Sequence, residues 1–159
     1  MAHSPRGAQA AGVALDDISK AIIERLQQDG RQSYAAIGKA VGLSEAAVRQ
    51  RVQRLQETGI MQIVAVTDPL TLGFCRQAMI GLKSDGDLQK LADDLCSMAE
   101  IDYVVISAGS FDMLIEVVCE DDDHLLEVLS NIRGIPSVTS TETFVYLKLA
   151  KQTYSWGTR

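Results

Sequence analysis

Residue patterns typical of secretion, membrane insertion or disulfide bonding are scarce in these 159 residues. Cys75, Cys96 and Cys119 are odd in number and far apart, which argues against a disulfide framework and against a zinc site. We expect them to be buried small side chains in a reducing compartment. No run of 18 apolar residues occurs, and the N-terminus lacks a basic segment followed by an apolar one. We therefore expect a cytoplasmic protein that does not contact a membrane.

The residue clusters that catalysis requires are also missing. The sequence has only two histidines, neither with neighbours that suggest a ligand set or a general base, and it has no Gly-rich phosphate loop. The acidic run Glu120–Asp123 fits the start of a helix better than a metal site, because negative charge is favourable at a helix N-terminus. We expect no enzyme activity, no cofactor and no metal.

What is present is a segment from Ser33 to Leu55 that predicts two short helices joined by a tight turn. Gly42 stands at the turn, where a left-handed backbone conformation costs glycine little, and Ser44 is a good N-cap for the second helix. Apolar residues before and after the turn recur at spacings of three and four, so each helix has one apolar stripe. This arrangement is a helix-turn-helix, which favours DNA binding.

The face opposite the second stripe carries side chains suited to reading DNA. We predict Arg49, Gln50 and Gln53 as base readers, with small Ala46 near the helix N-terminus and with Ser44, Arg51 and Arg54 nearer the phosphates. The full predicted DNA-binding set is Ser33, Ser44, Glu45, Ala46, Arg49, Gln50, Arg51, Gln53 and Arg54. The alternative is an ordinary helical hairpin whose arginines and glutamines form a solvated face.

Charge is divided unevenly along the chain. Residues 1–66 carry eight Lys and Arg against six Asp and Glu, and residues 67–159 carry seven against fifteen, so the two parts have net charges of +2 and −8. The asymmetry fits a mildly basic DNA-contacting module attached to an acidic one. A module with charge +2 makes few phosphate contacts, so tight binding should need two or more copies.

The remaining chain predicts a third helix before the pair, a strand, and then an α+β domain. Helical spacing runs from Asp17 to Asp29, and the β-branched segment Ile60–Val66 predicts a linking strand that ends at Thr67-Asp68-Pro69. Beyond it we expect strands at 75–83, 103–107, 111–119 and 138–149, with helices near 88–98 and 120–133. The order strand, helix, strand, strand, helix, strand is the ferredoxin-like arrangement, a four-stranded sheet with both helices on one face. The other face should be apolar and covered by a second copy.

This combination resembles the Lrp/AsnC, or feast/famine, family of transcriptional regulators. The resemblance covers about residues 15–150 and rests on LDDISKAIIERLQQDGR at 15–31, IGKAVGLSEAAVRQRVQRLQETGI at 37–60 and AGSFDMLIEV at 108–117. It implies a winged-helix-like, helix-turn-helix DNA-binding domain followed by a ferredoxin-like βαββαβ sensing domain. It also implies dimers that associate further, often into octamers, and a small amino acid bound between dimers.

The resemblance places the effector near a Gly-x-x-Asp hairpin, here Gly109 to Asp112. Asp112 could pair with the ammonium of an amino acid, while Gly109 and Ser110 supply donors for its carboxylate; the alternative is that Gly109 and Asp112 only shape the turn. Ser107, Thr139 and Thr141 are added because of their position alone. The predicted division is an arm at 1–14, a DNA-binding domain at 15–59, a linking strand and hinge at 60–74, a sensing domain at 75–150 and a tail at 151–159.

The leading hypothesis is thus a DNA-binding regulator of amino-acid metabolism that responds to an amino acid. Two alternatives remain: a small ferredoxin-like dimeric enzyme, and an amino-acid-binding module that acts on a protein partner. In the tail, Trp156 and Tyr154 predict packing across an interface or over a pocket mouth. The sequence does not identify the effector, the operator or the sign of regulation.

Overall fold

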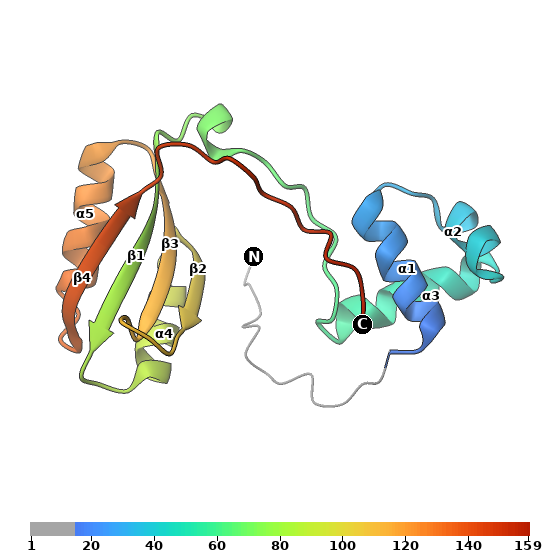
Figure 1. The fold of residues 1–159 in the computed structure, drawn as a ribbon, viewed down its shortest axis with the longest axis horizontal. Coiled ribbons are helices and arrows are strands. Elements are labelled where there is room, and N and C mark those ends of the chain that lie inside the picture. The colour runs from blue at the N-terminus through green and yellow to red at the C-terminus, as the bar shows by residue number, and fades with distance from the viewer. Residues whose placement is uncertain (1–14) are drawn as a thin grey trace. The chain divides into compact units, whose positions relative to one another are not determined.

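The chain folds into two units (Figure 1). A computed structural model describes residues 15–159, and the predicted disordered arm at 1–14 lies outside that part. Unit 1 consists of the described residues up to Ala65 together with Lys151–Arg159, and unit 2 is Val66–Ala150. The chain therefore leaves unit 1, forms unit 2 and returns to unit 1 for its last nine residues.

Unit 1 is built from the three predicted helices. These are α1 (Asp17–Gln28), α2 (Tyr34–Val41) and α3 (Glu45–Glu57). Each begins after a residue whose side chain accepts a hydrogen bond from a backbone N–H three residues on, namely Asp16, Ser33 and Ser44. These caps satisfy N–H groups that a helix cannot pair internally, which is why the three helices start where they do.

The apolar stripes of the three helices meet in one small core, as predicted. Its buried side chains are Ile22, Leu26, Ile37, Val48 and Val52. Tyr34 and Met61 are among the partly buried residues packed against this cluster. The core includes both sides of the turn, so the helix-turn-helix is held as one body.

The predicted linking strand is not formed. Residues 60–66 have no strand pairing, and Ile63, Val64 and Val66 are exposed. Strand geometry requires a hydrogen-bonded neighbour, and among residues 15–159 this segment has none. The predicted break after it is present: Asp68 caps a short 3₁₀ helix at Pro69–Leu72, η1, which the sequence analysis did not anticipate.

Unit 2 has the predicted ferredoxin-like fold. Its elements are β1 (Arg76–Ser84), α4 (Leu88–Cys96), β2 (Ile101–Ile106), β3 (Met113–Cys119), α5 (Asp122–Arg133) and β4 (Val138–Val145). The sheet order is β2-β3-β1-β4, with every neighbouring pair antiparallel. The central strand β1 pairs with both β3 and β4, so elements far apart in sequence flank it (Figure 1).

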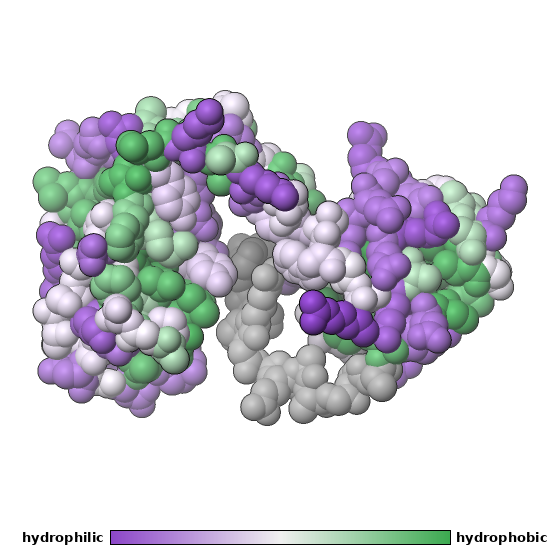
Figure 2. Space-filling model, in the orientation of Figure 1, coloured by the Kyte–Doolittle hydropathy of each residue, from purple (hydrophilic) through white to green (hydrophobic). Residues whose placement is uncertain are grey.

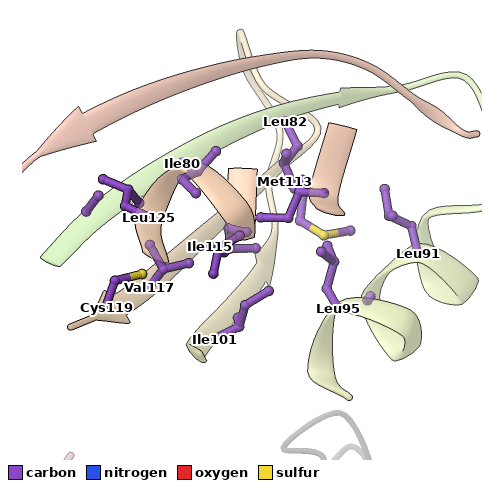
Figure 3. Close-up of a cluster of buried hydrophobic side chains, with 14 residues drawn as sticks. Ile80, Leu82, Leu91, Leu95, Ile101, Met113, Ile115, Val117, Cys119 and Leu125 are labelled. Atoms are coloured by element: carbon purple, nitrogen blue, oxygen red, sulfur yellow. The ribbon is translucent and has the colours of Figure 1, made fainter. Parts of the chain in front are cut away.

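Both helices pack on one face of the sheet. Alternate residues of β3, namely Met113, Ile115, Val117 and Cys119, are fully buried, as period-two alternation requires. Figure 3 shows these side chains directed toward Leu91 and Leu95 of α4 and Leu125 of α5. The cluster contains fourteen buried residues and is the main core of the protein.

The opposite face of the sheet carries many apolar side chains without cover from unit 2. Tyr103 on β2 and Phe144 on β4 are about half exposed, and hydrophobic surface is visible over this unit in Figure 2. Phe111 reaches this face from the β2–β3 hairpin, and its ring lies over Gly81, where a Cβ would come within 2.6 Å of it. Phe111 also meets Phe144 edge to face, at 6.3 Å between ring centroids. The predicted apolar second face is present.

Two smaller predictions were wrong. The last strand ends at Val145 rather than Leu149: the N–H of Tyr146 still donates to the carbonyl of Gln77 on β1 at 2.8 Å, but the register with β1 does not continue to Leu149. Of the cysteines, only Cys119 is buried. Cys75 precedes β1 and Cys96 ends α4, and both are exposed.

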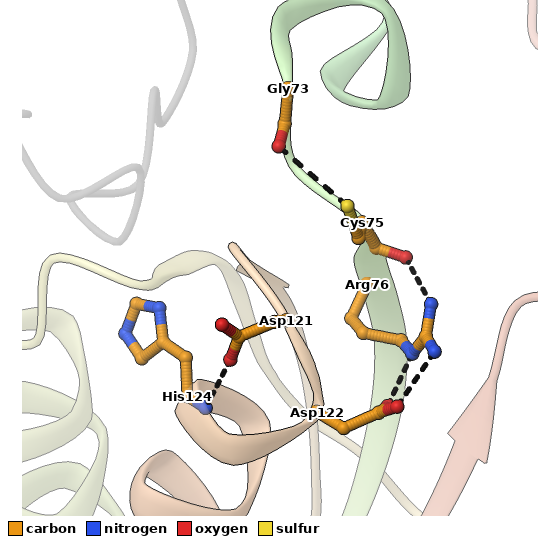
Figure 4. A network of polar contacts seen from close by, with 6 residues as sticks. All are labelled: Gly73, Cys75, Arg76, Asp121, Asp122 and His124. Carbon is orange, nitrogen blue, oxygen red and sulfur yellow. Dashed lines mark hydrogen bonds and ion pairs between the residues drawn. The ribbon is translucent and has the colours of Figure 1, made fainter.

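The acidic run acts as a helix start, as predicted. Asp121 caps α5 by accepting from the N–H of His124, at 2.8 Å. The carboxylate of Asp122 accepts two hydrogen bonds from the guanidinium of Arg76 on β1 (Figure 4). This pairing lowers the pKa of Asp122 and raises that of Arg76. The contacts therefore join α5 to the central strand.

Candidate functional site

The helix-turn-helix has the backbone that its sequence predicts. Gly42 ends α2 with φ 73°, in the left-handed region where a side chain would be strained. The chain then passes through Leu43 to Ser44, whose hydroxyl accepts from the N–H of Ala47 and starts α3. The turn between α2 and α3 is therefore short, which holds α3 in a fixed orientation against the rest of unit 1.

The predicted outer face of α3 is exposed along its length. Ala46, Arg49, Gln50, Gln53 and Arg54 are all exposed, as expected for the side of α3 opposite its apolar stripe. Arg49 forms an ion pair with Glu45, at 2.9 Å between Nη2 and Oε1, and Gln53 donates to Glu57 at 2.8 Å. Between residues 15 and 159, Gln50 and Arg54 make no side-chain hydrogen bond or ion pair through their polar ends. These two side chains are free to meet a ligand.

Arg51 occupies a different position from the other predicted contacts. Its Nη1 donates to both carboxylate oxygens of Asp16, at 2.9 and 2.7 Å, and to the hydroxyl of Ser19, at 3.0 Å. Bonds from Ser19 and then from Arg51 lower the pKa of Asp16 from 3.8 to about 2. Arg51 therefore fastens α3 to the start of α1 rather than lying on the outer face.

The remaining predicted DNA contacts lie at the helix starts. Ser33 and Ser44 are exposed, and each hydroxyl oxygen accepts a backbone bond while its own hydrogen stays available for donation. Glu45 is exposed beside Ser44. Positive ends of α2 and α3 thus reach the surface close to the outer face of α3, which suits phosphate groups.

The predicted effector hairpin is stabilised by its own polar side chains. Asp112 accepts from the N–H of Ser84 at 3.0 Å and lies 3.5 Å from the ammonium of Lys83. Ser107 donates its hydroxyl hydrogen to the carbonyl of Phe111 at 2.8 Å. Gly109 and Ser110 are exposed at the tip. The structure thus places Ser107 and Asp112 as supports of the loop and Gly109 and Ser110 as its outer surface.

Thr139 and Thr141 lie on β4, at the same end of the sheet as the hairpin. Leu82 of β1 pairs with Met113 on one side and with Thr141 on the other. A shallow hollow of about 310 Å³ is lined by Arg133, Val138, Thr139, Ser140 and Thr141. Arg133 donates from Nε to the hydroxyl of Thr141 at 2.9 Å.

Sequence reasoning did not single out Arg133. A basic residue in the last turn of a helix is ordinary, so nothing marked it. The sequence analysis also missed Tyr34, whose ring lies 5.4 Å from the guanidinium carbon of Arg49. The sequence did hold an indication of Tyr34, because it is an aromatic residue directly after a helix cap in the helix-turn-helix.

Residues 15–159 contain no cluster of three or more His, Cys, Asp or Glu side chains arranged to hold a metal ion. None of the helices in this part of the chain is both long and apolar enough to cross a membrane.

Comparisons with known proteins match both units. Residues 15–56 match the AsnC-type helix-turn-helix domain, and residues 74–159 match the family described as the PF0864 C-terminal dimeric alpha+beta barrel domain. The chain is 34% identical over 143 residues to the HTH-type transcriptional regulator FL11 of Pyrococcus horikoshii, covering 89% of this chain and 95% of that protein.

Solved structures show the same fold. The leucine response regulatory protein of Mycobacterium tuberculosis superposes with a TM-score of 0.80 at 25% identity, covering 87% of this chain and 96% of that one. A transcriptional regulator of Neisseria meningitidis, solved in complex with L-Met, gives 0.75 at 23% identity, with coverages of 89% and 95%. With its AsnC-type helix-turn-helix and its matching C-terminal domain, the chain belongs to the Lrp/AsnC family of DNA-binding transcriptional regulators.

Proposed function

We propose that this regulator reads operator sequence with the outer face of α3 and that a small amino acid, bound between C-terminal domains, changes its DNA affinity or its oligomeric state. The observation that carries the DNA-reading part is the exposed row of Arg49, Gln50, Gln53 and Arg54 on a helix held rigidly by its turn. These side chains offer the donor and acceptor groups that base edges in the major groove recognise.

The chemistry of the hairpin supports an amino acid as effector. A carboxylate has about four acceptor positions, and the backbone N–H of Ser84 uses one of those on Asp112. Room therefore remains for an ammonium group, although Lys83 competes for the same charge. Exposed backbone and hydroxyl groups at Gly109 and Ser110 can donate to the effector's carboxylate. A regulator of the same fold from Neisseria meningitidis was solved in complex with L-Met, which supports this ligand class.

The hollow on β4 offers a second set of donors. Arg133 and the hydroxyls of Thr139 and Thr141 line it, and no acidic residue does. We propose that these residues complete the effector site once a second subunit covers it, since the hollow in one chain is open and shallow. The effector's side chain or its carboxylate would then contact β4.

In this proposal, self-association supplies the DNA affinity that a single DNA-binding unit does not have. The matched C-terminal domain is described as dimeric, and the exposed sheet face of unit 2 fits that description. We propose that residues 60–66 become a strand when two subunits pair, which would cover Ile63, Val64 and Val66. Further association of dimers, up to an octamer, would join several weakly charged modules and raise their combined affinity through effective concentration.

Thermal-shift measurements with each of the twenty amino acids test the effector. Binding to the native state raises the melting temperature by mass action, so one amino acid or a few related ones should raise it. Asp112→Asn keeps an acceptor for Ser84 but loses the charge, and it should remove most of that rise. Asp94→Asn, on the exposed side of α4, is the matched control and should keep it. If Asp112→Asn responds like the wild type, the hairpin does not bind the ammonium.

Footprinting on the region upstream of the protein's own coding sequence tests the DNA-reading part. Protection at regularly spaced sites is the expected result, and the double variant Arg49→Ala, Gln50→Ala should lose selectivity while its sedimentation coefficient stays unchanged. Selective binding that survives this change would contradict the assignment of α3. No protection under any amino acid would favour action on a protein partner.

A further inference from the structure

Arg49 differs from the other cations on the outer face of α3 because two neighbours hold it. Glu45, one turn earlier on the same helix, bonds its Nη2 at 2.9 Å. Tyr34, the first residue of α2, places its ring 5.4 Å from the guanidinium carbon. Arg54, which shares the outer face, has neither an ion pair nor an aromatic partner among residues 15–159. The guanidinium of Arg49 is therefore held by contacts from two helices.

The position of the Tyr34 ring is fixed by its surroundings. The ring packs against the buried cluster of unit 1, and the residue before it is the α2 cap Ser33. A cation within about 6 Å of an aromatic ring centroid is attracted by the negative face of the ring. The ring that attracts Arg49 is thus packed against the same core as α3 itself.

The two contacts leave the reading capacity of Arg49 largely unused. A guanidinium has five N–H donors in one plane, of which Glu45 occupies one, and no other hydrogen bond from this group forms within residues 15–159. An edge of the group with two parallel donors stays open. Two parallel donors match O6 and N7 of guanine, the commonest specific arginine contact in the major groove.

From this geometry we infer that Tyr34 and Glu45 are positioning residues that hold Arg49 ready to read one guanine, so that they set selectivity at a single base position. The inference depends on the proposed reading of DNA by α3. A long side chain loses rotational freedom when it binds, and a side chain already confined by its neighbours loses less. The nearby carboxylate of Glu45 also makes Arg49 less attractive to a phosphate, which directs it to a base.

The test is a base-by-base comparison of variants on an operator selected from random duplexes by the wild-type protein. The dissociation constant is measured by fluorescence anisotropy for every single-base change, at fixed salt. One G·C pair should show a loss of between about fivefold and 150-fold on substitution, the range of a good bidentate contact. Arg49→Ala should abolish discrimination at that pair and leave the other positions as they were.

The role of Tyr34 is tested with two substitutions, one that keeps an aromatic ring and one that removes it. Tyr34→Phe keeps the aromatic face and should retain discrimination at that pair. Tyr34→Leu keeps an apolar side chain for the core but removes the face, and should lower discrimination there at least threefold. Glu45→Gln should lower it by less. Circular dichroism melting curves verify that each variant is folded at the assay temperature.

The outcomes separate three claims. If Tyr34→Leu weakens binding equally at all positions, or changes none of them, the positioning role is overturned, because a purely structural effect has no base preference. Discrimination at the G·C pair that persists in Arg49→Ala overturns the reading by Arg49. A wild-type protein that selects no sequence at all overturns the proposed function itself.

Discussion

The two units of this chain are stabilised in different ways. Unit 2 contains fourteen buried core residues between two helices and a sheet, whereas the core of unit 1 contains five. Polar contacts accompany the smaller core of unit 1: a side chain caps each of its three helices, and the bond between Arg51 and Asp16 joins α3 to the start of α1. The DNA-binding unit thus has the smaller apolar core, and the unit that matches a dimeric domain has the larger one.

The charges of the units show the same division of roles. With Lys151 and Arg159 of the returning tail counted, unit 1 carries ten Lys and Arg against six Asp and Glu, or +4, and unit 2 carries five against fifteen, or −10. The positive charge of unit 1 suits contact with phosphates, and the negative charge of unit 2 disfavours it. A charge of +4 allows one copy few phosphate contacts, which is why the proposed association of copies matters for operator affinity.

Equivalent core truncations should have the largest effect and should separate the units. Ile37 in unit 1 and Ile115 in unit 2 are both fully buried, and replacing either by Ala should cost about 2–5 kcal/mol of unfolding free energy. Because unit 1 has the smaller core, Ile37→Ala should unfold it while β3 stays protected. Hydrogen exchange with mass spectrometry resolves peptides of each unit. Loss of protection in both units of Ile37→Ala would mean that they fold as one.

A charge on the open sheet face should have the next largest effect, on association rather than folding. Leu114 lies on β3 between the buried residues Met113 and Ile115, so it belongs to the open face. Leu114→Asp should weaken self-association at least about tenfold, because a carboxylate would have to be buried without a partner. Leu126→Asp, at an exposed position on α5, is the matched control. Sedimentation velocity over a concentration series gives the answer; equal effects of the two variants would mean that the sheet face is not the dimer interface.

The sequence predicted those parts of both units that depend on neighbours in the chain. Gly42 and the caps Ser33 and Ser44 mark helix ends by local chemistry, and the alternation in β3 follows from strand geometry. Long-range pairs were not predictable in this way. Arg51 and Asp16 are 35 residues apart, so helical spacing alone left Arg51 among the DNA contacts.

The same limit applies to the candidate effector site and to the linking segment. The ring of Phe111 lies over Gly81 and so joins a hairpin to a distant strand. No short sequence pattern indicates this contact. Residues 60–66 have the composition of a strand but no partner within one chain, so composition alone could not determine their structure. Which residues complete the effector site depends on a second subunit in the same way.

Lowering the pH should show how much the charge of Asp16 contributes to the stability of unit 1. Asp16 has a folded-state pKa of about 2, below the ordinary 3.8, so its contribution to stability is present above about pH 4 and is lost as the pH falls toward 2. Asp16→Asn should therefore lower the melting temperature at pH 7, and the difference from the wild type should shrink by pH 2.5. Arg51→Gln should behave similarly but less strongly, since Ser19 supplies the largest part of the shift. A difference that is constant with pH would show that the Asp16 charge does not matter.

The smallest effect is expected where the chain returns to unit 1. The N–H of Gly157 donates to Oε1 of Gln27 at 3.1 Å, and the hydroxyl of Thr158 donates to Glu24, so the tail lies against α1. Gln27→Ala removes one partly exposed bond and should cost less than about 1 kcal/mol. Trp156, the single tryptophan, reports on the tail directly, and its fluorescence anisotropy should fall in Gln27→Ala. Gln28→Ala, one residue further along α1 and exposed, should leave the anisotropy unchanged. If both variants match the wild type, the tail is not held by this bond, and unit 1 consists of its helices and the segment that follows them.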